Sequence, residues 1–306
     1  MRINNNITAL NSHRQYGINN INIAKNVEKL SSGFRVNRAA DDAAGLAISE
    51  KMRAQIRGLN MASKNSQDAV SLVQTAEGGL QTIQDILQRM RELAIQSASD
   101  TNQNSVDREA LNLEVKQLIE EIDQIAVTTE FNRMQLLDGS FAGTGKTFTG
   151  TTSAPAPKGV TTELVIQAGA NEQQTMTITI GRMSSDGLGL TKTAMQENDG
   201  TAKPDTPLHI RNRQSASVAI GVVTTALNSV SMMRARLGAF QNRLEFKIQN
   251  LNNQAENVSA AESRIRDADM AKMMTEFTKN NILFQASTAM LAQANALPQG
   301  VLQLLG

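Results

Sequence analysis

The sequence predicts a mainly α-helical protein: an elongated, coiled-coil-like bundle of long helices built from both termini, with a small β-hairpin region and a short outer loop insert. Three observations predict this class. Residues 52–94 place mostly small or apolar side chains at alternating steps of three and four, the period of a left-handed coiled coil. Residues 111–125 and 220–251 repeat that spacing. Aromatic residues make up only 3% of the chain, which favours thin, interlocking helix pairs over a thick core.

The seam in residues 52–94 is the longest and needs long partners. As one helix it would extend for roughly 65 Å, longer than a compact domain is wide. Its seam residues are Met52, Gln55, Leu59, Ala62, Ser66, Ala69, Val73, Ala76, Leu80, Ile83, Leu87, Met90 and Ala94. The two partner stretches carry Leu111, Val115, Leu118, Ile122 and Ile125, and Ile220, Val223, Leu227, Val230, Leu237, Leu244, Ile248 and Leu251.

Glycines interrupt the long predicted helix at Gly45, Gly58, Gly78 and Gly79. Each glycine costs about 1 kcal/mol relative to alanine inside a helix. We therefore expect a neighbouring segment to approach the helix backbone closely at these positions.

The first 40 residues predict a terminal helix with a narrow apolar stripe. Gly33 predicts the end of this helix, and Asp41 with Asp42 predicts the N-cap of the long helix that follows. A stripe this narrow cannot stabilise a helix alone, so the N-terminal helix needs a partner.

A third helix is predicted to begin near Ser105 and end near residue 128. Short strands are predicted at 134–137, 163–167 and 175–180, with the last two forming a hairpin. Residues 183–210 contain many turn-forming residues and predict an exposed excursion of loops.

The C-terminal region predicts two further helices. The fourth helix is expected over 217–257, and a capping-box pattern from Ser259 to Glu262 predicts a new helix that Pro298 ends. Helices with narrow apolar stripes at both ends of a chain predict a polymerisation element that packs against other copies. The candidate self-assembly residues are Ile3, Ile7, Leu10, Ile21, Val27, Leu30, Ile265, Phe277, Leu283, Met290 and Leu297.

Composition argues against several other classes. The 30 Lys and Arg balance 29 Asp and Glu, so neither nucleic acid nor a membrane surface is an expected partner. The chain contains no Cys, and His13 and His209 lie outside any zinc-binding pattern, so no metal site is expected. Neither a phosphate-binding loop nor a serine nucleophile elbow occurs, so we expect no cofactor and no enzymatic activity. The N-terminus lacks a Sec signal, and polar residues interrupt the uncharged C-terminal tail, which argues against a membrane span.

Three blocks, residues 30–48, 257–271 and 286–295, resemble the signature regions of bacterial flagellins. The resemblance covers about residues 1–182 and 214–306. It implies a structural subunit of the flagellar filament that is exported unfolded, assembles into a helical tube for motility, and resides in the secreted, extracellular flagellum.

The same resemblance implies a division of the chain. Residues 1–40 plus 257–306 would form a terminal helical inner-tube domain. Residues 41–182 plus 211–256 would form a helical rod domain with β-hairpins at about 134–182. Residues 183–210 would form a short, surface-exposed variable insert.

The partners that the resemblance implies are other copies of the chain, a flagellar export chaperone at residues 263–306, and the flagellar cap and junction proteins. It also suggests recognition by Toll-like receptor five. Gln88, Arg89, Leu93 and Glu114 match that receptor site position by position, although protofilament contacts would equally explain them. Arg133 departs from the family pattern, because many relatives have glycine at this turn position.

Two alternative functions stay open at the level of sequence. The first is a hook–filament junction protein with flagellin-like termini, which would form a short ring rather than long filaments. The second is a protein that acts mainly as a receptor ligand. An enzyme has the least support.

Overall fold

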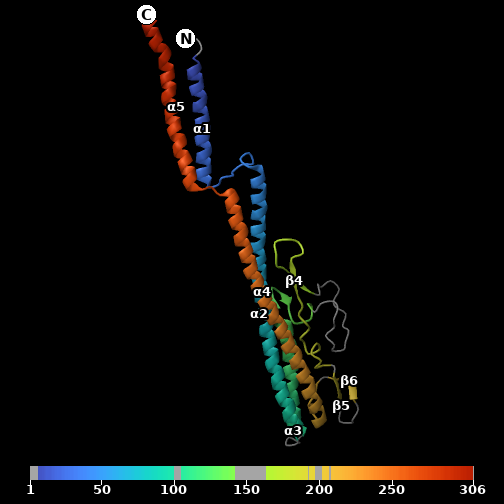
Figure 1. The fold of residues 1–306 in the computed structure, drawn as a ribbon. Coiled ribbons are helices and arrows are strands. Elements are labelled where there is room, and N and C mark those ends of the chain that lie inside the picture. Colours follow the sequence, from blue (N-terminus) through green and yellow to red (C-terminus); the bar gives the residue numbers. More distant parts are fainter. Residues whose placement is uncertain are drawn as a thin grey trace. The chain divides into compact units, whose positions relative to one another are not determined.

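The computed structural model describes residues 6–99, 105–141, 163–191, 193–196, 202–206 and 208–305. Helices dominate these residues and confirm the mainly α class (Figure 1). The helices are α1 (Ile7–Ser32), α2 (Ala43–Ala98), α3 (Ser105–Thr128), α4 (Arg213–Arg266) and α5 (Met270–Leu305). The strands form antiparallel pairs: β1 (Glu130–Phe131) with β2 (Met134–Gln135), β3 (Leu164–Gln167) with β4 (Thr175–Ile178), and β5 (Thr193–Gln196) with β6 (Ala202–Thr206).

The chain divides into two compact units. One unit combines Met1–Arg57 with Gln254–Gly306, and the other comprises Gly58–Asn253. Helices α2 and α4 each contribute residues to both units. The first unit brings together the two ends of the chain, and the second contains the main hydrophobic core.

The predicted seam of α2 forms the centre of the core in the larger unit. Every predicted seam residue from Leu59 to Ala94 is buried, whereas Met52 is half-buried and Gln55 is exposed. Each large apolar side chain that leaves water contributes about 1.5–3 kcal/mol. The buried apolar residues of α2 are Leu59, Ala62, Ala69, Leu72, Val73, Ala76, Leu80, Ile83, Leu87, Met90, Leu93 and Ala94.

Helices α3 and α4 cover this seam as predicted, but their contact faces are rotated slightly from the predicted stripes. The buried residues of α3 are Asn112, Val115, Ile119, Ile122 and Ala126, while Leu111, Leu118 and Ile125 are half-buried. In α4 the predicted Val223, Val230, Leu237, Leu244 and Leu251 are buried together with Ala216, Ala219, Ala226 and Met233. Alanines lie at the contact because their small side chains let the helix backbones approach closely. The predicted stripes counted mainly large apolar residues and therefore missed them.

Arg234 interrupts the predicted seam of α4 and links α4 to α2. Its Nη1 donates to Gln84 Oε1 at 2.7 Å, and its Nη2 lies 3.5 Å from Glu77 Oε1. The half-buried guanidinium therefore pairs with groups of α2 at the edge of the core, where it helps to determine the register of the two helices.

By length and composition, α4 contains a stretch apolar enough to cross a membrane. That stretch also supplies Val223 and Val230 to the core of the larger unit. About 33% of the stretch is buried within the described structure.

The turn between β1 and β2 uses an uncommon backbone conformation. Asn132 and Arg133 both have positive φ angles, 51° and 63°, and the strands pair Phe131 with Met134. Two consecutive left-handed residues are the pattern of a tight type I′ hairpin turn. The side chain of Arg133 therefore occupies a position that favours glycine.

The predicted hairpin of residues 163–180 is confirmed, with Ile166 and Ile178 buried in the core. The expectation that residues 183–210 are exposed was wrong at both ends of that stretch. Met183, Leu188, Leu190, Leu208 and Ile210 are buried in the core, and the side chains of 192–207 lie outside the described residues.

Asp123 holds the first part of this segment on α3. Its carboxylate accepts hydrogen bonds from the backbone N–H of Ser185 at 2.8 Å and from Ser185 Oγ at 2.6 Å. The turn-forming residues therefore shape a tight loop whose apolar side chains point inward. A composition rich in turn-forming residues therefore did not predict that these apolar side chains are buried.

The two ends of the segment meet at a buried polar junction. The Leu208 N–H donates to the Leu190 carbonyl at 3.0 Å. The Ile210 carbonyl accepts a hydrogen bond from Ser97 Oγ, and the Ile210 N–H donates to Asn112 Oδ1 at 3.1 Å. We name this arrangement the base clamp, because it joins the chain just before residues 191–207 to the chain just after them.

Two predicted helix boundaries near the C-terminus were wrong. Helix α4 continues through the Ser259–Glu262 pattern to Arg266, because a Ser and a Glu three residues apart also occur within helices. The break falls at Asp267–Asp269, and Asp269 Oδ1 caps α5 by accepting from Ala271 N at 3.0 Å and Lys272 N at 3.2 Å. Helix α5 also continues past Pro298 to Leu305.

Two adjacent helical glycines have different surroundings. A Cβ added at Gly78 would meet no atom within 4 Å, whereas one at Gly79 would lie 2.7 Å from Thr129 Oγ1 and 3.0 Å from Leu137 Cδ1. Thr129 Oγ1 already donates to the Ile125 carbonyl at 2.7 Å and cannot move freely. The expected close approach is therefore confirmed at Gly79 and was wrong at Gly78.

We predict that Gly78→Ala raises the free energy of unfolding by about 1 kcal/mol, since alanine is the better helix former. Gly79→Ala should lower it by about 1–3 kcal/mol through overpacking. Urea unfolding followed by circular dichroism checks both variants, each serving as the control for the other. Shifts of the same sign would contradict the analysis.

We also predict that Arg133→Gly stabilises the larger unit. A left-handed conformation costs a residue with a side chain roughly 1–2 kcal/mol, which exceeds the roughly 0.4–1 kcal/mol of extra unfolded-state entropy that glycine brings. Asn132→Gly is the matched control and should gain less, because asparagine tolerates this conformation. A lower urea midpoint for Arg133→Gly than for the natural chain would refute the prediction.

Candidate self-assembly surface

Helices α1 and α5 lie side by side and antiparallel, with both chain ends at the same end of the pair (Figure 1). The side chain of Asn6 caps α1 by accepting from Ala9 N at 3.1 Å, and its Nδ2 donates to the Ala294 carbonyl at 2.7 Å. Gly33 ends α1 with a φ of 73°, as predicted. One asparagine thus joins the start of α1 to the C-terminal half of α5.

The inward faces of α1 and α5 follow steps of three and four on both helices. The least exposed residues are Ala9, Ser12, Tyr16, Asn19, Ile23, Asn26 and Leu30 in α1, and Met273, Phe277, Asn280, Phe284, Ser287, Leu291 and Ala294 in α5. We name this contact the terminal seam. The rings of Tyr16 and Phe284 pack with their centroids 4.9 Å apart. The prediction of a narrow apolar stripe overlooked this seam, because its polar members hid the spacing.

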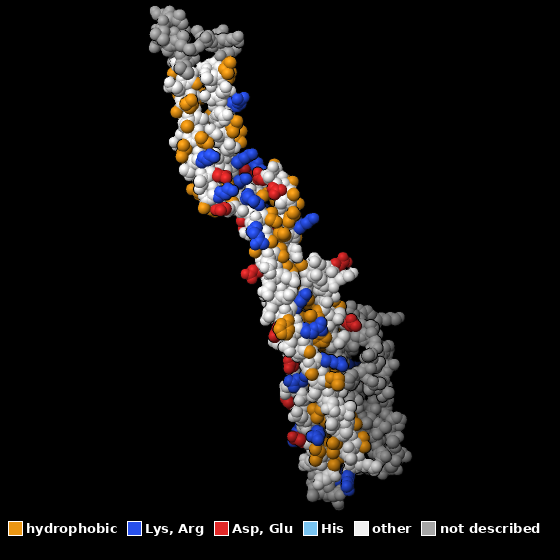
Figure 2. Space-filling model, in the orientation of Figure 1, with side chains coloured by type: hydrophobic (Ala, Val, Ile, Leu, Met, Phe, Trp, Pro, Cys, Tyr) orange, Lys and Arg blue, Asp and Glu red, His pale blue; other side chains and the backbone are white. Residues whose placement is uncertain are grey.

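Ten large apolar side chains of α1 and α5 lie outside the terminal seam and are exposed. Ile7 and Leu10 are each 65% exposed and Met290 is 61% exposed. The exposed apolar residues of α1 are Ile7, Leu10, Ile18, Ile21 and Val27, and those of α5 are Met270, Met274, Ile282, Leu283 and Met290. Figure 2 shows hydrophobic side chains along the surface of both helices. A large exposed apolar surface marks an interaction site.

Most of the candidate self-assembly residues belong to this outward surface. Ile7, Leu10, Ile21, Val27, Leu283 and Met290 are exposed. Leu30, Ile265 and Phe277 are half-buried, and Phe277 belongs to the terminal seam. Ile3 and the side chain of Leu297 lie outside the described residues.

Backbone hydrogen bonds join the connector between α1 and α2 to the connector between α4 and α5. The Arg35 N–H donates to the Arg266 carbonyl at 2.7 Å, and the Ala268 N–H donates to the Gly33 carbonyl at 2.9 Å. The guanidinium of Arg266 lies over the ring of Phe34, 4.8 Å from its centroid, and bonds to Glu50. Charged side chains of both signs gather around these connectors (Figure 2).

Two carboxylates of this region titrate below their ordinary range. The hydrogen bond from Arg266 lowers the pKa of Glu50. Backbone N–H groups of Arg38 and then Asn37 lower the pKa of Asp41. Both carboxylates therefore stabilise the connectors above their unfolded-state pKa values, and this contribution is lost as pH falls through the lowered values. Asp42 caps α2 as predicted, since its Oδ1 accepts from the Gly45 N–H at 2.8 Å, but Asp41 accepts from Asn37 and Arg38 in the connector and does not cap the helix. Sequence reasoning also missed Arg266.

The proposed receptor or protofilament contact lies on α2 and α3 of the larger unit. Arg89 Nη2 lies 2.9 Å from Glu114 Oε1, and Arg89 Nη1 lies 3.3 Å from Glu92 Oε2. Hydrogen bonding to Glu114 raises the pKa of Arg89. Gln88 and Arg89 are exposed, but Leu93 is only 1% exposed. The expectation that Leu93 touches a partner was therefore wrong for the folded chain, because its side chain belongs to the core.

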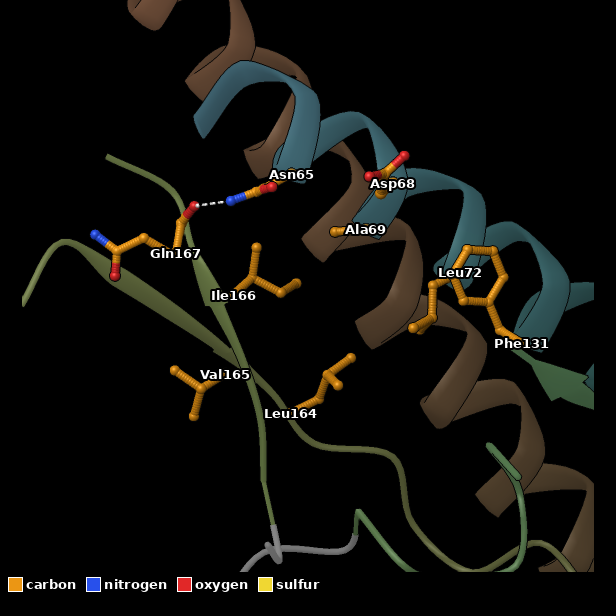
Figure 3. Close-up of a pocket in the computed structure, with 9 residues that line it drawn as sticks. All are labelled: Asn65, Asp68, Ala69, Leu72, Phe131, Leu164, Val165, Ile166 and Gln167. Atoms are coloured by element: carbon orange, nitrogen blue, oxygen red, sulfur yellow. Dashed lines mark hydrogen bonds between the residues drawn. The ribbon is translucent and has the colours of Figure 1, made fainter. Parts of the chain in front are cut away.

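A shallow groove of about 370 Å³ lies between α2 and β3 (Figure 3). It is lined by Asn65, Asp68, Ala69, Leu72, Phe131, Leu164, Val165, Ile166 and Gln167. Asn65 Nδ2 donates to the Gln167 carbonyl at 3.4 Å across one end of the groove. The lining is mainly apolar with one carboxylate, so it offers no pair of groups for acid–base chemistry. In the part of the chain that the structure describes, no group of three or more His, Cys, Asp or Glu could hold a metal ion.

Comparison with known proteins identifies the family. The family model of the bacterial flagellin N-terminal helical region matches residues 3–142, and that of the bacterial flagellin C-terminal helical region matches residues 220–305. Together these matches include α1, α2 and α3 at one end and most of α4 with α5 at the other.

Full-length relatives agree with these matches. The chain is 51% identical to flagellin of Bacillus subtilis over 321 residues and 50% identical to flagellin of Halalkalibacterium halodurans over 305 residues, with 100% of each chain covered. The crystal structure of Bacillus cereus flagellin is 32% identical, with a TM-score of 0.46, and the match covers 65% of this chain and 94% of that one. Flagellins are a structural protein family. The chain therefore belongs to the bacterial flagellins and is a structural subunit of the flagellar filament.

Proposed function

We propose that copies of this flagellin join through the outward apolar side chains of α1 and α5. The observation that carries this proposal is the exposure of ten large apolar side chains on this helix pair, which the terminal seam leaves uncovered. Each such side chain gains about 1.5–3 kcal/mol when a neighbour covers it. A contact between two different surfaces of identical copies repeats from copy to copy, and it builds an open helical filament when the repeated rotation does not close into a ring.

We propose the following division of labour along the chain. Residues 1–40 plus 257–306 form the inner tube, and residues 41–182 plus 211–256 form the surrounding rod. The compact unit that joins the two ends of the chain supports the grouping of the termini. The continuous core of the other unit supports a rod that stays folded regardless of its neighbours.

Export and capping partners follow from the same exposed surface. We propose that an export chaperone covers α5 within residues 263–306 before assembly, because Met274, Ile282 and Met290 would otherwise associate prematurely. The flagellar cap and junction proteins would contact the same helices at the filament ends. The assembled filament would be extracellular.

The sequence alone also allowed a hook–filament junction protein, whose termini would present a similar surface. Filament length separates the two, because a junction protein stops after a short ring. Full-length identity near 50% to two flagellins favours the filament subunit.

We predict that Leu10→Glu blocks polymerisation while the helices stay folded. A carboxylate buried without a partner costs well over 1.4 kcal/mol, the equivalent of a tenfold change in equilibrium constant. The critical concentration for seeded polymerisation, measured by sedimentation and negative-stain microscopy, should therefore rise at least tenfold.

The matched control is Gln15→Glu, which adds the same charge at an exposed polar position of α1. It should polymerise like the natural chain. Normal filament growth by Leu10→Glu would refute the proposed surface.

We also propose that the exposed Arg89 and Glu114 pair is recognised by Toll-like receptor five. This pair projects from the folded core, so a receptor can reach it on the monomer. Removing an exposed ion pair has little effect on stability. We therefore predict that Arg89→Ala weakens receptor signalling by purified monomer while its unfolding midpoint stays unchanged.

The control for this prediction is Arg91→Ala, which removes the same charge from an exposed position two residues away. Equal signalling by both variants in a reporter-cell titration would count against Arg89 as a receptor contact. A loss of polymerisation in Arg89→Ala would instead assign the residue to filament contacts.

A further inference from the structure

One aromatic side chain of the larger unit projects away from its core. Phe246 on α4 is the only exposed phenylalanine among those that the structure describes, and it is 70% exposed. It follows the buried Leu244 by two residues, roughly 200° around the helix, so its ring points outward. Exposed aromatic side chains are enriched where proteins bind each other and often anchor the contact. Phe246 is therefore a candidate contact residue outside the helix pair of α1 and α5.

The shallow groove between α2 and β3 has a lining that suits such a ring (Figure 3). Leu72, Phe131, Leu164 and Ile166 supply apolar surface, and Val165, which also lines the groove, is 56% exposed. The volume of about 370 Å³ falls within the roughly 300–1,000 Å³ of typical binding pockets. The groove can therefore receive one aromatic side chain.

The ring and the groove lie level with each other on opposite sides of the antiparallel pair of α2 and α4 (Figure 1). Ser63 Oγ of α2 donates to Asn252 Oδ1 of α4 at 3.1 Å. Six residues from this contact along each helix, Ala69, which lines the groove, lies level with Phe246. Asp68, also in the groove, lies roughly 140° around α2 from Ser63, and Phe246 lies roughly 120° around α4 from Asn252. One chain therefore cannot insert its own ring into its own groove.

The charges beside the ring and in the groove are complementary when two copies share one orientation. Lys247 directly follows Phe246, and Asp68 lines the groove one turn before Leu72. Because α4 runs antiparallel to α2, a neighbour whose ring lies near Leu72 presents Lys247 toward Asp68 and Glu245 toward the opposite end. Within the described part of the chain, neither Asp68 nor Lys247 forms an ion pair. Both charges are therefore available to a second copy.

We propose that Phe246 of one copy inserts into the groove between α2 and β3 of a neighbouring copy, with Lys247 facing Asp68. The contact rests on the role of the chain as a filament subunit, and it adds to the proposed surface on α1 and α5. Because the ring and the groove are different surfaces, the contact repeats from copy to copy. One ring in a shallow groove is far smaller than a standard interface, so the contact forms in the filament, where other contacts hold the copies together.

Introduced cysteines report this contact directly, since the natural chain contains none. Full-length Phe246→Cys and Val165→Cys chains are mixed, polymerised and treated with a short bifunctional thiol reagent. We expect cross-linked dimers in filaments of the mixture, but none in mixed monomers or in filaments of either variant alone. Val106→Cys, at a residue that is 69% exposed on α3, is the matched control for Phe246→Cys and should give far fewer dimers. Mixed filaments without dimers, or equal yields from the control mixture, would overturn the proposal.

Replacing the ring measures its contribution to assembly. Phe246→Ala should raise the critical concentration for seeded polymerisation about tenfold or more, because the groove no longer covers an apolar ring. Its urea midpoint should stay unchanged, since the ring is exposed in the monomer. Met232→Ala, which shortens a 48% exposed side chain of the same helix, should change the critical concentration much less. A natural critical concentration for Phe246→Ala would contradict the proposal.

Reversing the two charges tests the orientation of the contact. Asp68→Lys and Lys247→Asp should each raise the critical concentration a few-fold, and the double variant should return it toward that of the natural chain. Absence of this rescue would refute the pairing of Asp68 with Lys247. Leu10→Glu tests the surface on α1 and α5 separately, because it leaves the ring and the groove unchanged. Filaments that require Leu10 but not Phe246 would thus overturn only the present proposal.

Discussion

The one-sided seam of α2 is the constraint on which the larger unit depends. Helix α2 has 56 residues, and its seam is buried without interruption from Leu59 to Ala94. A helix of this length cannot bury such a face against itself, so α3 and α4 must lie along it. The hairpins then fill the remaining space with Leu136, Leu137, Ile178 and Ile180, each of which is fully buried. Arg234 and the buried glycine contact at Gly79 determine how the covering elements are placed.

The pair of helices α1 and α5 in the smaller unit differs from α2, because much of its apolar surface stays exposed. Its internal contact mixes polar, aromatic and small side chains with a few large aliphatic ones, and ten large apolar side chains face outward. Such a pair is only partly stabilised within one chain, and the proposed contacts with neighbouring copies would supply the rest of its stability. Many modest repeated contacts then hold a filament together more effectively than one strong site, because each added copy is bound by several neighbours at once.

The long helices and the family could be predicted from sequence because both signals are repeated over many residues. The seam of α2 extends over many turns, and the three signature blocks occur in the expected order. Features that depend on a single local pattern were less predictable. The Ser259–Glu262 pattern has the spacing of a capping box, but a helix interior allows the same spacing, so only the hydrogen bonds at Asp269 locate the break.

The burial of individual side chains was the other property that could not be predicted from the sequence. Leu93 matches a receptor anchor by position, yet it lies on the covered side of α2. Leu188 and Leu190 stand among turn-forming residues, and the hydrogen bonds from Ser185 to Asp123 direct them inward. Asn19 and Asn26 are polar, so a search for apolar stripes excluded them from the contact face that they share with Tyr16 and Ile23. In each case the deciding interaction comes from a residue distant in sequence.

Because of the base clamp, the length of the segment between Leu190 and Leu208 has little effect on the stability of the core. The chain leaves the core at Leu190 and returns at Leu208, and these residues are hydrogen-bonded to each other and buried. The segment between these two residues therefore begins and ends at neighbouring positions of the core. Lengthening that part therefore adds only loop-closure entropy, about 0.6 kcal/mol for each doubling. The sequence between Leu190 and Leu208 can therefore change in length at little cost to the core.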